Sequence, residues 1–196
     1  MNSGSRFGFT LIELLIVVAI IGILAAIAVP NFLNAQMRAK IAKAEAEMQT
    51  IVTALESYRI DNNLYPLWLN PDGSQKNPLD RRLIPLTTPV AYMASVPQDP
   101  FIYGPPGVRV NEAQDAAYIT YDYTEAWSRI HFGGLAVVPV QARCADYKLT
   151  SAGPDYTNTW GNTVTYMMSN GLTSQGDLIR LGARTSLPCD DSLVGK

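Results

Sequence analysis

Two hydrophobic patterns follow one another along the first part of the chain. From Phe9 to Val29 almost every position carries a large apolar side chain or an alanine, and only Thr10, Glu13 and Gly22 depart from the run. A helix over this segment rises about 1.5 Å per residue and therefore spans about 31 Å, which is close to the hydrocarbon thickness of a bilayer. The first pattern predicts a membrane-spanning helix over residues 9–29.

Beyond Pro30 the apolar positions recur every three or four residues, with charged residues between them. This spacing is typical of an amphipathic helix, which we expect over residues 30–60. Pro30 lacks a backbone donor and crowds the preceding turn, so it is expected to kink or locally loosen the helix without ending it. The apolar stripe that the rest of the chain must cover consists of Ile41, Ala44, Met48, Ile51, Val52, Leu55 and Tyr58.

The remaining chain, residues 61–196, is expected to form one β-rich globular domain. The run D-N-N-L-Y-P at 61–66 combines turn-forming residues with a proline, so it ends the long helix. Closely spaced prolines from Pro66 to Pro106 then favour loops. Strands are predicted at 118–123, 135–140 and 164–168, and antiparallel pairing against the helix gives an α+β fold.

The residues in front of the apolar run resemble a short leader. Residues 1–8 are polar and small with one cation, Arg6, which favours retention on the cytoplasmic side. A secretory signal peptide has its small-residue cleavage site after the apolar core, whereas no such site follows Val29 here. The small residue Gly8 lies before the core, so cleavage there leaves the apolar helix as the new N-terminus.

The sequence G-F-T-L-I-E at 8–13, followed by the apolar run, resembles the processing signal of type IV pilins and type II secretion pseudopilins. The resemblance implies that a prepilin peptidase cuts between Gly8 and Phe9 and methylates the new amine of Phe9. It also places Glu13 and Pro30 at the positions of the family's glutamate and helix-loosening proline. The small residues of the run then suit close helix packing in a filament core as well as in a membrane.

Glu13 is expected to act in assembly. An ionisable group inside a membrane-length segment costs roughly 2.5–3.5 kcal/mol, so an unpartnered carboxylate there needs a reason. Processing creates an amine at Phe9, about one helical turn away. We expect Glu13 to set the register of the filament by pairing with Phe9 of a neighbouring subunit, because a buried anion gains most from a well-placed cation. The alternative is a tolerated polar residue that faces lipid headgroups.

Several later segments resemble the major pseudopilins of type II secretion. They are Tyr65-Pro66 at the end of the helix, V-P-Q-D-P-F at 96–101, Y-K-L-T-S-A-G-P-D at 147–155 and G-D-L-I-R at 176–180. Pseudopilins of that kind bind calcium in a loop near the C-terminus. The resemblance implies Ser151, Asp155 and Asp177 as side-chain ligands, with backbone carbonyls and water completing the six to eight oxygens that calcium takes.

The spacing of these candidate calcium ligands departs from the family pattern. A long segment from Tyr156 to Gln175 replaces the usual compact acidic loop. The alternative is therefore that Gly153, Pro154 and Asp155 form a plain turn, while Asp177 is a surface residue or a helix cap.

The chain has two cysteines, Cys144 and Cys189, both in the part expected outside the membrane, where oxidation is possible. A disulfide between them would stabilise the fold by about 4 kcal/mol on chain-entropy grounds. Many pilins of the pilus branch have such a bridge near the C-terminus, whereas major pseudopilins usually rely on calcium. We expect a disulfide here, with free thiols as the alternative.

Catalytic patterns are missing from the sequence. His131 is its only histidine, and no nucleophile elbow, phosphate-binding loop or zinc-binding helix motif occurs. The formal net charge is −2, and no dense basic patch suggests nucleic acid as the main ligand. A structural role is therefore favoured over a membrane-anchored enzyme.

The resemblance implies a structural subunit of a type II secretion pseudopilus, a periplasmic filament that drives protein export. The alternative is a type IV pilin that serves adhesion, motility or DNA uptake. In either case the expected partners are copies of itself, other pilins or pseudopilins, the prepilin peptidase, and an inner-membrane assembly platform with its ATPase. The expected location is the inner membrane, crossed once, with the globular domain in the periplasm until the subunit enters a cell-envelope filament.

Overall fold

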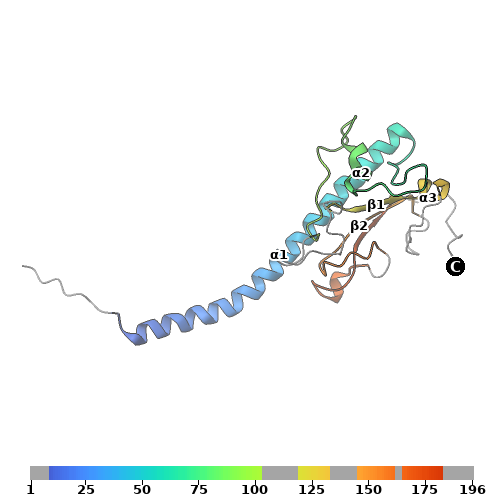
Figure 1. Ribbon diagram of the computed structural model, residues 1–196. Helices are drawn as coiled ribbons and strands as arrows, with labels where there is room; N and C mark the ends of the chain where they lie inside the picture. The colour runs from blue at the N-terminus through green and yellow to red at the C-terminus, as the bar shows by residue number, and fades with distance from the viewer. Residues whose placement is uncertain (1–8, 103–118, 133–144, 162–164, 183–196) are drawn as a thin grey trace, which may run out of the picture. The chain divides into compact units, whose positions relative to one another are not determined.

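The computed structural model describes residues 9–102, 119–132, 145–161 and 165–182. The chain divides into two compact units, one ending at Arg38 and the other beginning at Ala39. The elements are α1 (Leu11–Asn62), α2 (Asp80–Leu83), the 3-10 turn η1 (Ile84–Leu86), β1 (Asp122–Glu125), α3 (Ala126–Phe132), β2 (Tyr147–Ser151), the 3-10 turn η4 (Met168–Asn170) and β3 (Leu178–Leu181) (Figure 1). A long N-terminal helix and a small antiparallel sheet confirm the expected α+β class.

Helix α1 combines both predicted helical segments in one element. It continues through Pro30 and ends at Asn62. The end has a local cause, because Asn63 adopts the left-handed conformation with φ of 57° and donates its backbone N–H to the carbonyl of Arg59 at 2.8 Å. Asparagine tolerates this conformation better than most residues, and the bond satisfies a carbonyl that the helix end leaves open.

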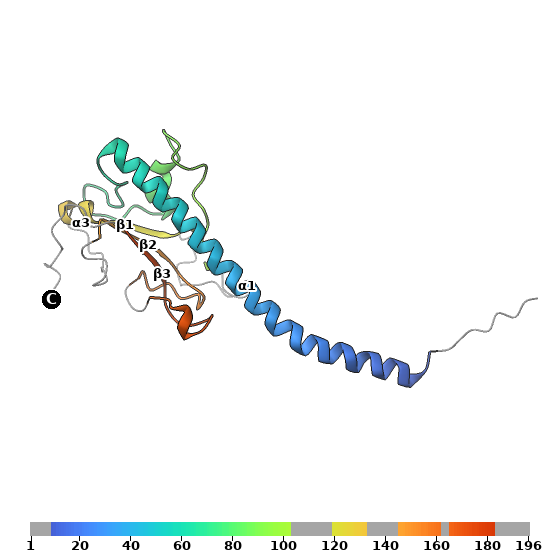
Figure 2. The ribbon, with the colours of Figure 1, turned by 180° about the vertical axis from the view of Figure 1, so that it is seen from behind.

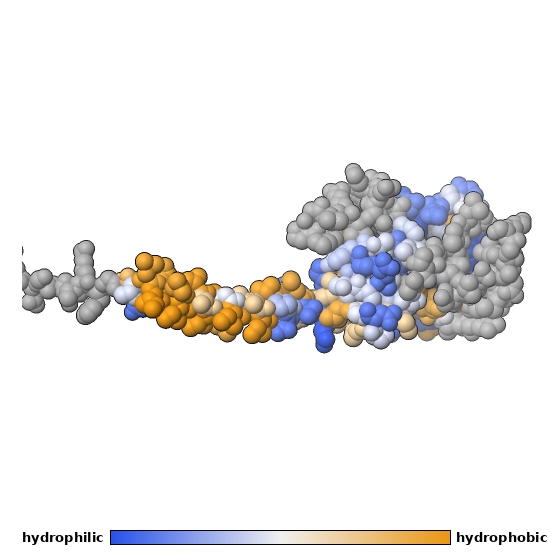
Figure 3. Space-filling view, turned by 90° about the horizontal axis from the view of Figure 1, so that it is seen from below, coloured by the Kyte–Doolittle hydropathy of each residue, from blue (hydrophilic) through white to orange (hydrophobic). Residues whose placement is uncertain are grey.

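The apolar part of α1 in the first unit is uncovered. Every large apolar side chain from Phe9 to Leu33 is exposed, and Figure 3 shows their surface as a nearly continuous hydrophobic one. Among the described residues, this is the one helix that is long and apolar enough to cross a membrane. Water is a poor solvent for such a surface, so lipid or protein must cover it.

The second unit contains a three-stranded antiparallel sheet in the order β1-β2-β3 (Figure 2). Asp122 lies opposite Thr150 in the first pair of strands, and Ser151 lies opposite Leu178 in the second. The later part of α1 crosses the sheet in both ribbon views. Its buried stripe consists of Ile41, Ala44, Met48, Ile51, Ala54 and Leu55. The prediction that the rest of the chain covers this stripe is confirmed, although Val52 and Tyr58 are only half-buried.

Four tyrosine hydroxyls bind the charged residues beside this stripe. The pairs, from the start of the unit to the end of α1, are Lys40 with Tyr156 at 3.2 Å, Glu47 with Tyr121 at 2.7 Å, Glu56 with Tyr65 at 2.9 Å and Asp61 with Tyr92 at 2.8 Å. Burial raises the pKa of Tyr65 to about 12, and burial raises the pKa of Tyr121 as well. These hydroxyls therefore stay protonated and donate to the helix carboxylates.

The predicted strands were only partly correct. The strand expected at 118–123 overlaps β1, whereas the one expected at 164–168 is wrong: Thr165 forms a single bridge to Asp177, and a 3-10 turn starts at Met168. The strand expected at 135–140 lies outside the described residues. Strands β2 and β3 were not predicted, because β2 buries the polar residues Lys148, Thr150 and Ser151 along with its apolar ones and shows no alternation.

A buried ionic cluster explains how charged residues fit inside this sheet. Arg82 Nη1 lies 2.7 Å from Asp122 Oδ1, and Lys148 Nζ lies 3.5 Å from Asp122 Oδ2, with all three side chains at most 5% exposed. Arg82 also donates to the carbonyls of Lys76 and Tyr123, and Lys148 donates to the carbonyl of Trp160. The cluster joins α2 and the segment before it to β1 and β2.

We predict that Asp122→Asn destabilises the second unit by about 3–5 kcal/mol, since it removes the negative charge that the buried cations Arg82 and Lys148 share. Urea unfolding of the full chain in detergent micelles, followed by tryptophan fluorescence, measures the change. Asp72→Asn is the matched control, because Asp72 is exposed and its carboxylate accepts hydrogen bonds from Ser74, two residues away. A loss no larger for Asp122→Asn than for this control contradicts the prediction.

Candidate functional site

Thr10 and Glu13 cap the start of α1 with reciprocal hydrogen bonds. The Glu13 Oε2 atom accepts the Thr10 backbone N–H at 2.8 Å and the Thr10 hydroxyl at 2.6 Å. The backbone N–H of Glu13 donates to Thr10 Oγ1 at 3.4 Å. This arrangement is a capping box, in which the side chains three residues apart satisfy backbone donors that a helix start leaves open.

The capping box gives Glu13 a role within its own chain that the sequence analysis missed. The T-x-x-E spacing at 10–13 is its signal and was readable from the sequence. Glu13 remains exposed, and a carboxylate has about four lone-pair positions, so the group still has room for a cation from outside the chain. Phe9 is the first described residue and is exposed, while Gly8 lies outside the described residues.

The β2–β3 pairing brings two of the three predicted calcium ligands together. Asp155 Oδ2 accepts the backbone N–H of Gly176 at 3.1 Å, directly before Asp177. Backbones approach closely here: a Cβ added to Gly153, whose φ is +73°, would lie 2.3 Å from the carbonyl oxygen of Gly176. Glycine is therefore required at 153 for the two loops to meet.

Asp177 is a buried carboxylate that organises the loop before it. It accepts the backbone N–H and hydroxyl of Thr159 at 3.2 and 3.0 Å, and the backbone N–H of Gly161 at 2.6 Å. Trp160, between them, has a φ of 58°. Burial raises the pKa of Asp177, and the negative charge of Asp155 raises it further. A buried carboxylate with a second negative charge near it is an electrostatic setting in which a cation is stabilising.

Ser151, the third predicted calcium ligand, binds a different carboxylate, that of Asp99. Ser151 Oγ donates to Asp99 Oδ1 at 2.9 Å, and Asp99 also accepts the backbone N–H groups of Phe101 and Ala152. Burial raises the pKa of Asp99. The sequence indicated Asp99 only as part of the V-P-Q-D-P-F run at 96–101. Nothing in that run predicted that the Asp99 carboxylate would bind Ser151 at the end of β2.

The donor set therefore fits a calcium ion only in part. Asp155 and Asp177 supply carboxylate oxygens that retain lone pairs beside their hydrogen bonds, whereas Ser151 Oγ donates to Asp99 and accepts the backbone N–H of Gly153. Within the part of the chain that the structure describes, no three acidic, histidine or cysteine side chains converge as a metal cluster. A calcium ion between Asp155 and Asp177 would need backbone carbonyls and water for most of its six to eight ligands. Calcium stays a prediction.

The predicted Cys144–Cys189 disulfide also stays a prediction, because both cysteines lie outside the described residues.

In comparisons with known proteins, two family models match successive segments of the chain. A model described as the prokaryotic N-terminal methylation motif matches residues 4–29, and one described as type II secretion system protein G matches residues 31–112. The first match includes Gly8, Phe9 and Glu13. The second covers the amphipathic part of α1 and the segment that follows it.

Among individual proteins, the chain is similar to the type II secretion system core protein G of Escherichia coli, with 33% identity over 114 residues that cover 57% of this chain and 76% of that protein. It is 42% identical to the core protein G of Pseudomonas aeruginosa over 66 residues, 34% of this chain and 46% of the relative. The type IV major pilin protein PilA of Myxococcus xanthus is 50% identical over 66 residues, 34% of this chain and 30% of that pilin.

The match to the first curated relatives, which include the Myxococcus xanthus pilin and the Pseudomonas aeruginosa core protein G, spans less than half of their length. No solved structure matches it significantly.

Proposed function

The chain belongs to the family of type II secretion system core protein G, and we propose that it is a structural subunit of a pseudopilus, a filament that drives protein export. The observation that carries the proposal is a fully exposed apolar helix start, matched by the methylation motif, on a chain whose next segment matches protein G. Neither feature supplies catalytic chemistry, and both suit a subunit that is stored in a membrane and then packed into a fibre.

The properties of α1 suit a subunit that lies first in a membrane and then in a filament. The helix start satisfies its own backbone donors through Thr10 and Glu13, so it tolerates lipid, where unsatisfied polar groups are costly. The same exposed surface includes Gly22 and several alanines, which allow helices of neighbouring subunits to approach closely after extraction from lipid. A change of surroundings from lipid to protein leaves the apolar side chains covered throughout.

We infer the remaining steps from the family. A prepilin peptidase would cut between Gly8 and Phe9 and methylate Phe9, and an inner-membrane platform with its ATPase would extract subunits into a filament of this protein and other pseudopilins. The subunit would wait in the inner membrane with its globular part in the periplasm. Glu13 would pair with the amine of Phe9 on a neighbouring subunit, using the lone pairs that Thr10 leaves open.

A type IV pilin is the second candidate. The 50% identity to a major pilin supports it, but that match covers only 66 residues. The protein G model extends to residue 112, beyond the helix, and favours secretion.

A deletion strain distinguishes the two candidates. We expect loss of the gene to leave exoproteins in the periplasm while surface pili remain, because the filament serves export. Proteomics of the culture medium and electron microscopy of the cells measure both outputs, and a plasmid copy of the gene is the control. Normal secretion together with missing surface fibres would contradict the proposal and assign a pilin.

The assembly role of Glu13 is separable from its capping role. Glu13→Gln removes the charge but keeps an oxygen that accepts the hydrogen bonds from Thr10, whereas Thr10→Ala removes the cap and keeps the charge. We expect Glu13→Gln to lower filament yield about tenfold or more, and Thr10→Ala to lower it less, since a cap contributes only about 0.5–2 kcal/mol. Counting sheared filaments at equal membrane levels gives the answer, and equal yields for wild type and Glu13→Gln would refute the charge pairing.

We also propose that Asp155 and Asp177 hold a calcium ion with neighbouring carbonyls and water. Calcium should raise the melting temperature of the full chain in micelles, and Asp177→Ala should abolish that rise. Since burial raises the pKa of Asp177, protons compete for this carboxylate, and the rise should shrink as the pH falls. Asp72→Ala is the control that keeps the rise; identical melting in calcium and in chelator removes the site.

A further inference from the structure

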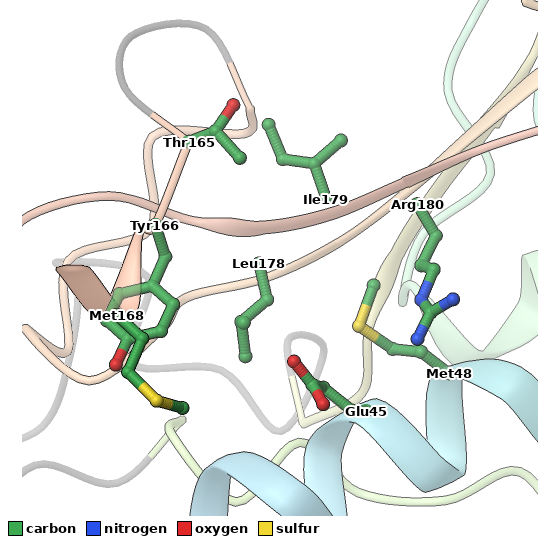
Figure 4. A pocket seen from close by; sticks show the side chains of 8 residues that line it. All are labelled: Glu45, Met48, Thr165, Tyr166, Met168, Leu178, Ile179 and Arg180. Carbon is green, nitrogen blue, oxygen red and sulfur yellow. The ribbon is translucent and has the colours of Figure 1, made fainter. Parts of the chain in front are cut away.

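A groove opens between α1 and β3 in the second unit, with a volume of about 310 Å³ (Figure 4). Its floor consists of three buried residues, namely Met48 of α1, Leu178 of β3 and Tyr166 from the segment before η4. Figure 4 shows Leu178 projecting from β3 toward α1. The rim consists of Glu45 on the α1 side, Arg180 on β3 and Met168, which is 56% exposed.

The size of the groove limits what it accepts. A cavity of about 150 Å³ holds one benzene molecule, so this open groove takes one or two aliphatic side chains rather than a helix. Its apolar floor and the exposed methionine favour such side chains, because methionine adapts its shape to a partner. The groove is therefore suited to a small apolar projection with charge beside it.

The same unit carries a projection of that kind at the end of α1. Ile60 is 79% exposed and Leu64 is 39% exposed, and they lie four residues apart with Asp61 between them. This end is held in place, because the Tyr92 hydroxyl donates to Asp61 at 2.8 Å and the Tyr58 and Tyr92 rings pack edge to face. We call Ile60, Asp61 and Leu64 the helix tip.

An open filament of identical subunits needs two different surfaces that fit each other, since one self-complementary surface closes into a dimer. The groove and the helix tip are different surfaces on one unit. We propose that the helix tip of one copy docks into the groove of the next copy, with Ile60 and Leu64 over the apolar floor. This inference rests on the proposed function, because it assigns the contact between neighbouring subunits of the filament.

The charges fix the orientation of this contact. Arg180 lies on one rim, where its Nη1 donates to Gln49 Oε1 at 3.3 Å, and its guanidinium has further donors for Asp61 of the incoming copy. Glu45 lies on the α1 side and repels Asp61 in the reversed orientation. Complementary charges of this sort specify register and exclude wrong pairings.

A photocrosslinker tests the contact in assembled filaments. The substitution Met168→p-benzoylphenylalanine places the probe on the groove rim of an otherwise native chain, in cells with the assembly machinery intact. After irradiation, we expect a covalent dimer in which mass spectrometry maps the link to residues 60–64 of the second copy. The matched control is Ile130→p-benzoylphenylalanine, since Ile130 of α3 is also exposed and belongs to neither surface; it should give no link to residues 60–64.

A charge exchange provides the second test. Asp61→Arg and Arg180→Asp should each lower filament yield about tenfold, because like charges then face each other, and the double variant should recover it. Arg81→Asp, a reversal of an exposed cation on α2, is the control and should leave the yield unchanged. Membrane levels and melting temperatures verify that each variant folds.

The outcomes separate the docking surface from the proposed function. Wild-type filaments whose crosslinks map to another segment, or that give no linked dimer, overturn the docking surface alone. Absence of filaments from the wild-type protein in the presence of the machinery overturns both, whereas links to residues 60–64 together with recovery in the double variant support both.

Discussion

The exposed apolar part of α1 is the constraint on which the other features of this protein depend. Every large side chain from Phe9 to Leu33 is uncovered, and such a surface is stable only against lipid or against other protein. In the proposed function, cleavage before this segment would keep it in the mature chain, and the folded second unit would remain outside the lipid. A capped helix start makes the segment compatible with both surroundings.

The second part of α1 has a different role, because it supplies much of the core of a unit whose sheet is small. An apolar stripe packs into the core, and tyrosine hydroxyls bind Lys40, Glu47, Glu56 and Asp61 along its flank. Each such bond contributes modestly, roughly 0.5–1.5 kcal/mol and more to a charged partner, but their spacing fixes the helix along its length. The helix tip and the groove are therefore presented by one well-connected unit.

The sequence predicted the long helix and its buried stripe well, because both follow from periodicity. It also singled out Asp155 and Asp177, and Asp155 binds the backbone of Gly176, the residue before Asp177. It did not predict β2 or β3. Lys148 is polar by pattern and is buried with its ammonium group bound by Asp122 and by the carbonyl of Trp160. Asp122 lies on another strand, and the sequence gives no sign of that pairing. The pairing of Ser151 with Asp99, across 52 positions, was hidden for the same reason.

The most direct measurement is the intact mass and N-terminal fragmentation of the protein isolated from cell membranes. The account predicts a chain that begins at Phe9, carries one methyl group on its N-terminal amine, and retains the whole of α1. A chain that still carries residues 1–8, or one that has lost the apolar run by cleavage after Val29, would contradict it.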